Sequence, residues 1–192
     1  SQDTYLWYVG TDIDAKFDAF TAWGTVLHNG GQIDKDTAGT TSDVDISAWL
    51  FAAGADAGIF HGQAFYATGD DDDTDNDIDS FVLIGGNGSG ASYYWSEIMG
   101  LGTFDNNLGG NANLGDKISN IWAANLGVTL KPMDKLTLGL DVWYAQLDEK
   151  VLVNGQMEDD LGLEIDTKLT YQLMDNLKAD FIYAYLFAGD AV

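Results

Sequence analysis

The stretch "LGLEIDTKLTYQLMDNLKADFIYAYLF", residues 161–187, alternates between apolar and polar residues along almost its whole length. The alternation is interrupted once, at Met174-Asp175-Asn176, and then resumes. A period of two is the spacing of a β-strand, whose side chains point alternately to opposite faces. The stretch therefore predicts two strands joined by a tight turn, with one apolar and one polar face. The first of these faces carries Leu161, Leu163, Ile165, Thr167, Leu169, Tyr171 and Leu173, then Leu177, Ala179, Phe181, Tyr183, Tyr185 and Phe187.

The composition of the 192-residue chain limits what it can bind. There are 31 acidic residues against 8 basic ones, all of them lysine, and the formal net charge is −23. This excludes nucleic acid as a partner, because phosphate binding needs a basic surface. A hydrophobic content of 46% is too high for a disordered chain. There is no cysteine, no apolar run approaches the roughly 18 to 20 residues of a membrane-spanning helix, and we expect any signal peptide to have been removed.

Turn residues divide the rest of the chain into hairpins. Tight turns are predicted at 17–20, 53–58, 131–135 and 173–177. They separate eight predicted strands, near 4–17, 20–29, 43–53, 58–68, 118–130, 136–147, 159–173 and 177–188. The remaining connections, 30–42, 69–117 and 148–158, are predicted to be long loops. Short turns at one end of a sheet and long loops at the other are typical of outer-membrane barrels.

The last two hairpins repeat each other. Met133-Asp134 recurs as Met174-Asp175, and in each case a leucine, Leu136 or Leu177, lies two residues after the aspartate. Pairing like residues across each turn predicts the register. The predicted cross-strand pairs are Val128 with Leu138, Leu126 with Leu140, Trp122 with Tyr144, Leu169 with Phe181 and Thr167 with Tyr183.

The two predicted faces differ in chemistry. The apolar face is uniformly large and aliphatic with aromatic residues near the strand ends, as on a lipid-facing surface with aromatic girdles. We expect the polar face to line a channel, through Asp12, Asp14, Lys16, Asp141, Glu164, Asp166, Lys168, Lys178 and Asp180. Trp49 and Trp143 either pack within the sheet or project inward, where a ring could stack on a sugar.

These patterns predict an all-β fold: an antiparallel transmembrane β-barrel with about eight up-and-down strands. Residues 1–192 form a single segment of it, and 69–117 form a long, acidic and glycine-rich extracellular loop. Counting strands puts both chain ends on the long-loop side, whereas a complete barrel has them in the periplasm. We therefore expect an internal part of a larger barrel. A soluble β-sandwich, which also alternates apolar-in and polar-out, is the alternative fold.

Two stretches carry a resemblance to a known family. "NLGVTLKPMDKLTLGLDVWYA", residues 125–145, and the stretch 161–187 resemble the terminal hairpins of alginate-export-type outer-membrane porins. "YYWSEIMGLGTFDNN", residues 93–107, resembles a loop in porin-like relatives of that group. The resemblance implies a wide single-chain barrel that passes anionic polysaccharide through an arginine-rich lumen. This chain has no arginine and an acidic polar face, so we expect it to favour cations instead.

Two smaller features are candidates for chemistry. Aspartates at alternate positions are typical of the start of a calcium loop, although no glycine or glutamate completes the motif. The candidate calcium ligands are Asp71, Asp73, Asp75, Asp77 and Asp79; the alternative is a solvated acidic loop. The two histidines, His28 and His61, have no catalytic spacing and are predicted to be polar residues of the lumen or rim. "FVLI", residues 81–84, is either a short strand or a plug segment that folds into the lumen.

The sequence therefore predicts a porin-like channel in the outer membrane of a Gram-negative bacterium. It would be in contact with membrane lipid and lipopolysaccharide and would pass small hydrophilic solutes without catalysis or a required cofactor. The acidic lumen would make passive diffusion cation-favouring. One alternative is a calcium-dependent soluble or surface-attached β-sandwich binding module. Another is a membrane-embedded hydrolase that depends on His28 or His61.

Overall fold

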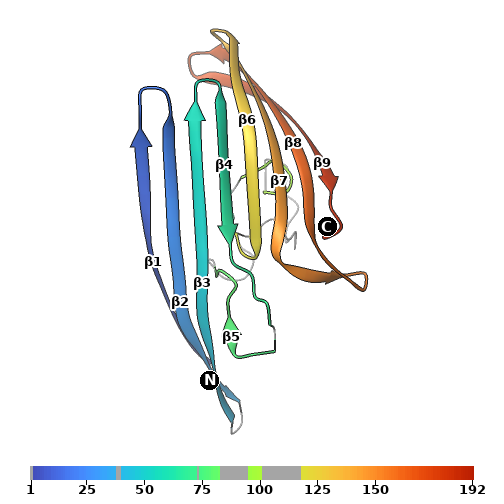
Figure 1. Ribbon diagram of the computed structural model, residues 1–192. Helices are drawn as coiled ribbons and strands as arrows, with labels where there is room; N and C mark the ends of the chain where they lie inside the picture. The colour runs from blue at the N-terminus through green and yellow to red at the C-terminus, as the bar shows by residue number, and fades with distance from the viewer. Residues whose placement is uncertain (1, 38–39, 73, 83–94, 101–117) are drawn as a thin grey trace.

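The computed structural model describes residues 2–37, 40–72, 74–82, 95–100 and 118–192. Within these ranges the chain forms one nine-stranded sheet, in which eight strands follow the order β1-β2-β3-β4-β6-β7-β8-β9 (Figure 1). Neighbours on this path are antiparallel, so the all-β, up-and-down prediction is confirmed. The described sheet is not closed, and β1 and β9 are its edges. The strands are β1 (Gln2–Lys16), β2 (Thr21–Thr37), β3 (Thr40–Ala57), β4 (Phe60–Ala67), β5 (Asp77–Ile78), β6 (Ile121–Met133), β7 (Leu136–Val153), β8 (Gln156–Met174) and β9 (Leu177–Ala188).

Two of the predicted long loops are wrong. β2 continues to Thr37 and pairs with β3 from Thr40, so most of 30–42 is strand. β7 and β8 likewise extend through 148–158 and meet at the two-residue turn Asn154-Gly155. Both turn residues have positive φ, 50° and 88°, which is the backbone of the tight turn that matches strand twist. Only the connection between β4 and β6 is long among the described strands, and part of it, β5, pairs in parallel with β3.

The predicted registers are confirmed in one hairpin and wrong in the other. Between β8 and β9, Leu169 pairs with Phe181 and Thr167 with Tyr183, as predicted. Between β6 and β7, Val128 instead pairs with Leu140, because the ladder closes at Met133 and Leu136 and contains an irregularity before Met133. Leu126 pairs with Val142, Trp122 with Gln146, and Tyr144 with Ala124. The shift is two residues, so it leaves every side chain on its predicted face.

Described segments outside the sheet cover one of its faces, and none of them covers the other. We call the first the covered face; it carries Tyr8, Phe65 and Trp143, against which residues 81–82 and 95–100 pack. We call the second the open face; Leu126 and Trp49 lie on it, with exposed fractions of 77% and 41%. The strand registers carry both faces across the whole sheet.

The hydrophobic core lies between the covered face and the β4–β6 connection. Trp95 packs edge-on against both Trp143 and Phe65, with ring centroids 5.0 and 5.3 Å apart. Phe81 packs edge-on against Tyr8 at 6.3 Å. The same buried cluster includes Ala48, Ala67, Met99, Ile118, Ile121, Ala123, Ala145, Leu147, Leu161 and Ala191. Small residues on the strands make room for aromatic rings from the connection.

The β7–β8 turn gives a prediction about stability. Gly155→Ala puts a Cβ on a residue with φ of 88°, which an L-residue adopts at a cost of roughly 1 to 2 kcal/mol. The control is Gly139→Ala in β7, where a Cβ meets only the Lys168 carbonyl oxygen at 3.9 Å. We expect a lower free energy of unfolding, measured by urea titration, for the first variant only. Equal effects of both variants would contradict the assigned turn.

Candidate functional site

The nine predicted channel-lining residues all lie on the covered face, but they do not form one group. Those on β1 and β9 sit toward the two edges of the sheet, while Asp141, Asp166 and Lys168 line a shared cavity in its middle. Asp12 and Asp14 are exposed, and Asp12 accepts a hydrogen bond of 2.6 Å from the Thr25 hydroxyl. The residues toward the edges are Asp12, Asp14, Lys16, Lys178 and Asp180.

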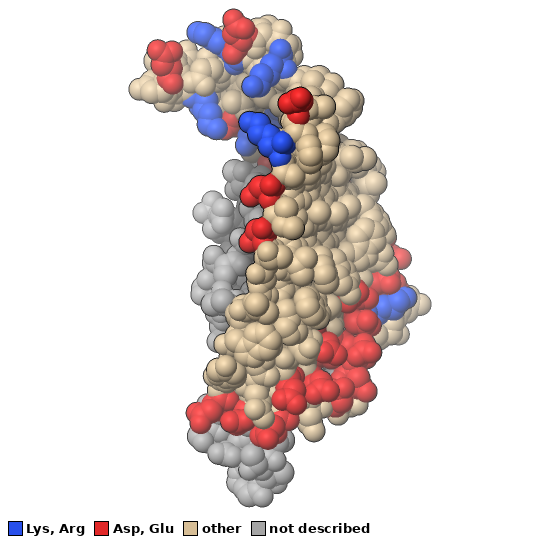
Figure 2. All heavy atoms as spheres, turned by 60° about the vertical axis from the view of Figure 1, so that its left-hand side comes forward, with Lys and Arg blue, Asp and Glu red and all other residues tan. Residues whose placement is uncertain are grey.

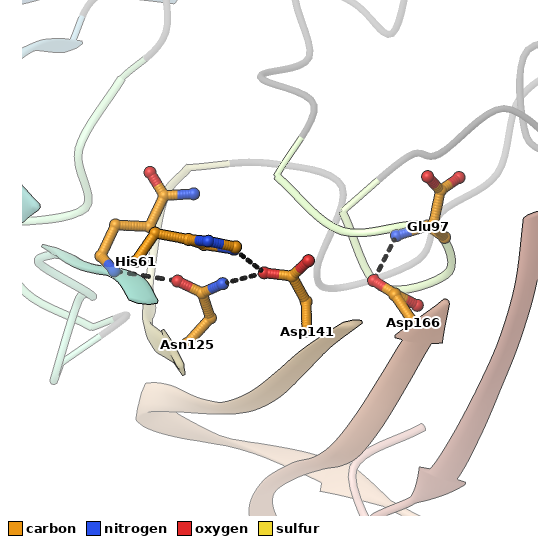
Figure 3. A network of polar contacts seen from close by, with 6 residues as sticks. His61, Glu97, Asn125, Asp141 and Asp166 are labelled. Carbon is orange, nitrogen blue, oxygen red and sulfur yellow. Dashed lines mark hydrogen bonds and ion pairs between the residues drawn. The ribbon is translucent and has the colours of Figure 1, made fainter. Parts of the chain in front are cut away.

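Glu164 and Asp166 hold residues 95–100 against the sheet. Glu164 is completely buried; its carboxylate accepts hydrogen bonds from the amides of Ile98 and Met99, at 2.7 and 2.8 Å, and from the Ser96 hydroxyl at 3.0 Å. Asp166 Oδ2 accepts from the Glu97 amide at 3.2 Å (Figure 3). A buried charge needs hydrogen-bond donors, and the Glu164 carboxylate has three of them. Glu164 therefore attaches the segment to the sheet and does not meet open solution.

A second polar network joins three strands beside this segment. His61 Nε2 lies 2.8 Å from Asp141 Oδ1, and Asn125 Nδ2 donates to the same oxygen at 2.6 Å (Figure 3). The Asn125 side-chain oxygen accepts from the Gln63 amide at 2.8 Å, which fixes the orientation of its amide. Gly127 lies between His61 and Asp141 in the strand register, and a Cβ there would collide with both side chains. The glycine thus leaves the space in which histidine and aspartate meet.

Between the two networks lies a cavity of about 380 Å³. Its walls carry four carboxylates and one lysine, and three tryptophan rings form much of its apolar surface. Trp23 enters this space because it lies over Gly54, where a Cβ would contact the indole ring. The lining residues that bear charge or an aromatic ring are Asp56, Glu97, Asp141, Asp166, Lys168, His61, Trp23, Trp95 and Trp143.

Asp166 has an unusual position in this cavity. Only 7% of its surface is exposed, and its Oδ1 atom has no hydrogen-bond donor among the described residues. Asp141 pairs directly with Asp166 across β7 and β8, so two carboxyl groups lie side by side on one face. Like charges in directly opposite positions destabilise a sheet unless something neutralises them.

The open face carries a row of aromatic side chains across most of the sheet. His28 lies between Trp7 and Trp49, with ring centroids at 5.1 and 4.4 Å, and Phe51 continues the row toward Tyr66. Trp122 pairs with Tyr66 and contacts Tyr144, and Tyr185 contacts Phe187 on β9. Phe17 and Phe20 stack at 4.5 Å near the opposite end of β1 and β2. We call the row from Trp7 to Phe187 the aromatic belt.

Charged residues lie beyond the aromatic belt. Asp3, Asp34 and Asp43 are neighbours across β1, β2 and β3. Figure 2 shows acidic side chains gathered toward one end of the molecule and several lysines toward the other. Along β1, β2 and β3 the open face therefore carries a charged residue first, then the aromatic belt, and then mainly aliphatic residues.

The structure places both of the tryptophans whose direction the sequence left open, and it also places His28 and Ser96, the side chains that bear on a hydrolase. His28 lies on the open face, opposite to the face that carries the predicted channel-lining residues, with Nδ1 2.9 Å from the Ala48 carbonyl oxygen; it shares this face of β2 with Val26 and Gly30. Trp49 is also on the open face, while Trp143 is 3% exposed against Trp95. The Ser96 hydroxyl contacts Glu164 and the Gly100 amide, so it forms no catalytic pair with His61.

The acidic segment is organised by local turns. Asp72 accepts from the Thr74 amide and hydroxyl at 3.0 and 2.5 Å, and these bonds lower the pKa of its carboxyl group. Asp75 accepts from the Asp77 amide at 2.8 Å. Asp73 lies outside the described residues, and the ranges that are described contain no group of three or more potential ligands arranged around a metal position. Calcium binding by Asp71, Asp73, Asp75, Asp77 and Asp79 stays a prediction.

Part of the predicted plug segment can be located. Phe81 is buried, and Val82 accepts a hydrogen bond of 2.7 Å from the Tyr8 hydroxyl and donates to Asn29 at 3.1 Å. Both residues therefore lie against the covered face. Residues 83–84 are outside the described ranges.

Comparisons with known proteins assign no family. No protein-family model matches the sequence, and no curated protein matches it significantly. In the described part of the chain, no helix has the length and apolar character needed to cross a membrane. The likeness to alginate-export-type porins thus stays a prediction.

The anchoring role of Glu164 can be tested by amide exchange. Glu164→Gln replaces a charged acceptor with a neutral amide, which weakens its hydrogen bonds by roughly 1.5 to 3 kcal/mol. The amides of Ile98 and Met99 should then exchange about tenfold to a hundredfold faster. Asp180→Asn, at an exposed carboxylate bonded to Thr170, is the matched control. Unchanged exchange at both amides in Glu164→Gln would show that the segment is held by other contacts.

Proposed function

We propose that this chain forms part of the wall of a bacterial outer-membrane β-barrel, a porin-like channel for passive diffusion of small hydrophilic solutes that favours cations. The observation that carries the proposal is the open face. It exposes large apolar side chains across the whole sheet, with no described segment over them. Soluble proteins rarely leave so large a continuous apolar surface uncovered.

The layout of the open face fits the dimensions of a membrane. Phe17, directly after the end of β1, follows Trp7 by ten residues, and Phe187 follows Leu177 by ten residues on β9. A tilted strand needs about 9 to 11 residues to cross the hydrocarbon layer. The aromatic belt lies at one end of this span, where aromatic rings sit at the boundary between lipid and water. In the proposal, the acidic residues beyond the belt meet lipopolysaccharide head groups and water.

The sandwich alternative receives less support from the same observation. A β-sandwich packs a second sheet onto the apolar face of the first. Here the described segments outside the sheet, residues 81–82 and 95–100, pack on the covered face instead. That arrangement supports lipid, rather than a second sheet, as the proposed partner of the open face.

The proposal also requires that the sheet close into a complete barrel. Backbone groups at a free strand edge cannot be satisfied in lipid, so only closed barrels cross membranes as sheets. β1 and β9 are the edges of the described sheet. We therefore propose that further strands pair with both edges in a larger barrel, with the covered face toward the lumen.

Charge on the covered face gives the expected selectivity. Asp12, Asp14 and Asp180 would attract cations into the lumen and repel anions. Lys16 and Lys178 near the short turns, and Lys168 farther along β8, would supply the opposite sign and so produce a field across the pore. Glu164 acts on residues 95–100, so it contributes little to this field.

The reversal potential of the native protein in a planar bilayer under a KCl gradient tests this function. We expect steady conductance with a reversal potential of the sign that K⁺ selectivity produces. Replacing Asp12 and Asp14 together by asparagine should move the potential toward zero. Asp134→Asn, at an exposed turn position, should leave it unchanged. Absence of conductance from correctly folded protein would contradict a channel, and an anion preference would contradict the selectivity.

A further inference from the structure

The open face is hollowed beside the aromatic belt, on the side toward the short turns. There a row of small residues follows a row of large ones across neighbouring strands. The large row is Val26, Phe51, Tyr66 and Trp122, and the small row is Gly24, Ala53 and Ala64. The step between the rows forms a groove of about 660 Å³, with Ile13 of β1 also in its wall. No charged residue is among the described residues that line it.

The groove is accessible to a partner from outside the chain. A Cβ on Gly24 would meet only the Ala52 carbonyl oxygen, at 3.8 Å, so side chains from other strands leave the space over this glycine free. Ala53 and Ala64 are both exposed. The volume lies within the range of about 300 to 1,000 Å³ that small-molecule sites occupy. A flexible hydrocarbon chain can follow such a surface and gain the dispersion contacts that an unfilled hollow loses.

The height of the groove fits one end of a lipid chain. In the proposed function the aromatic belt marks the boundary between lipid and water. The groove starts at the belt and continues toward the short turns, so it lies where the acyl chains of the membrane begin. A lipid with one chain in the groove would therefore have its head group at the belt.

The charge at this end of the groove favours a head group with a positive charge. The Tyr66 hydroxyl, at the rim of the groove, donates to Asp148 Oδ2 at 3.0 Å, which puts a carboxylate directly beyond the ring. Asp34 and Asp43 are paired farther out on β2 and β3. Acidic side chains gather toward this end of the molecule and several lysines toward the other (Figure 2). A head group with an ammonium group complements this surface, whereas one with only negative charge does not.

A second copy of the chain fits the groove less well than a lipid. In a membrane, two copies related by a two-fold axis along the membrane normal present the same patch at the same height. The two grooves would face each other and leave a void between them, which loses packing contacts. An acyl chain fills the groove instead.

We propose that this groove binds one acyl chain of a phospholipid with a primary-amine head group, of the phosphatidylethanolamine class, with the ammonium group beside Asp148. The inference rests on the proposed function, because it takes the open face to meet lipid. It goes further in assigning one lipid to one place on that face, in addition to the lipids that surround the barrel elsewhere.

Native mass spectrometry of the folded protein in detergent tests the head group. The protein is titrated with phosphatidylethanolamine and with phosphatidylglycerol of the same chains, without divalent cations that would bridge two anions. We expect one tightly bound phosphatidylethanolamine and at least about tenfold weaker binding of phosphatidylglycerol, the size of effect that one charge-assisted hydrogen bond gives. Asp148→Asn should remove most of this difference, while Asp134→Asn should leave it unchanged.

Filling the groove tests the position of the chain. Ala53→Leu together with Ala64→Leu places larger side chains in the groove, and both positions are exposed, so the sheet has room for them. We expect this double variant to bind phosphatidylethanolamine about tenfold more weakly or worse. The matched control is Ala179→Leu, at an exposed position opposite Tyr171 on β9 and outside the groove, which should bind like the native protein.

The contradicting outcomes are distinct from a failure of the channel. Equal binding of the two lipids, or equal weakening by Ala179→Leu, would overturn the proposal. Dimers that the double variant separates would overturn it in favour of a second copy. Conductance without selective lipid binding would contradict the groove and keep the channel. Selective binding to a protein without conductance would support the groove and contradict the channel.

Discussion

Antiparallel pairing, repeated from β1 to β9, is the constraint on which the rest of the structure depends. Each ladder fixes which residues lie opposite one another, and alternation then fixes the face of every side chain. One sheet consequently has one face of mainly apolar, exposed side chains and one face on which polar side chains surround a buried apolar cluster. The described part of the β4–β6 connection covers the middle of this second face, and no described segment covers the first. A surface of this kind needs lipid or another apolar partner.

Carboxylates on the covered face have two different tasks. Glu164 is buried and fully hydrogen-bonded, so it joins residues 96–99 to β8. Asp12 and Asp14 remain exposed to solvent, where in the proposed channel their charge would act on passing ions. Asp166 is buried as well: one oxygen accepts from the Glu97 amide, and the other lies buried beside the Glu164 carboxyl group. The position of a carboxylate relative to residues 95–100 therefore determines whether it supports the fold or stays exposed to solvent.

The fold was predictable where the sequence alternates cleanly. Residues 161–187 gave both strands and the correct β8–β9 register. The extensions of β7 and β8 were missed because acidic residues obscure the alternation, although Asn154-Gly155 is a strong hairpin signal. The β6–β7 register was wrong because an irregularity near Met133 is invisible to simple pairing. The cavity was beyond prediction: its contacts join Glu97 to Asp166, 69 residues apart, and no periodic pattern marks residues 95–100.

The central claim is that the open face contacts lipid and the covered face does not. The six tryptophans test it directly, since Trp7, Trp49 and Trp122 lie on the open face while Trp23, Trp95 and Trp143 are on the covered side. Variants that keep one tryptophan each, reconstituted in bilayers containing brominated lipid, would report quenching of each ring separately. The account predicts strong quenching of the first three and weak quenching of the others. Equal quenching in both groups, or none in the first, would contradict it.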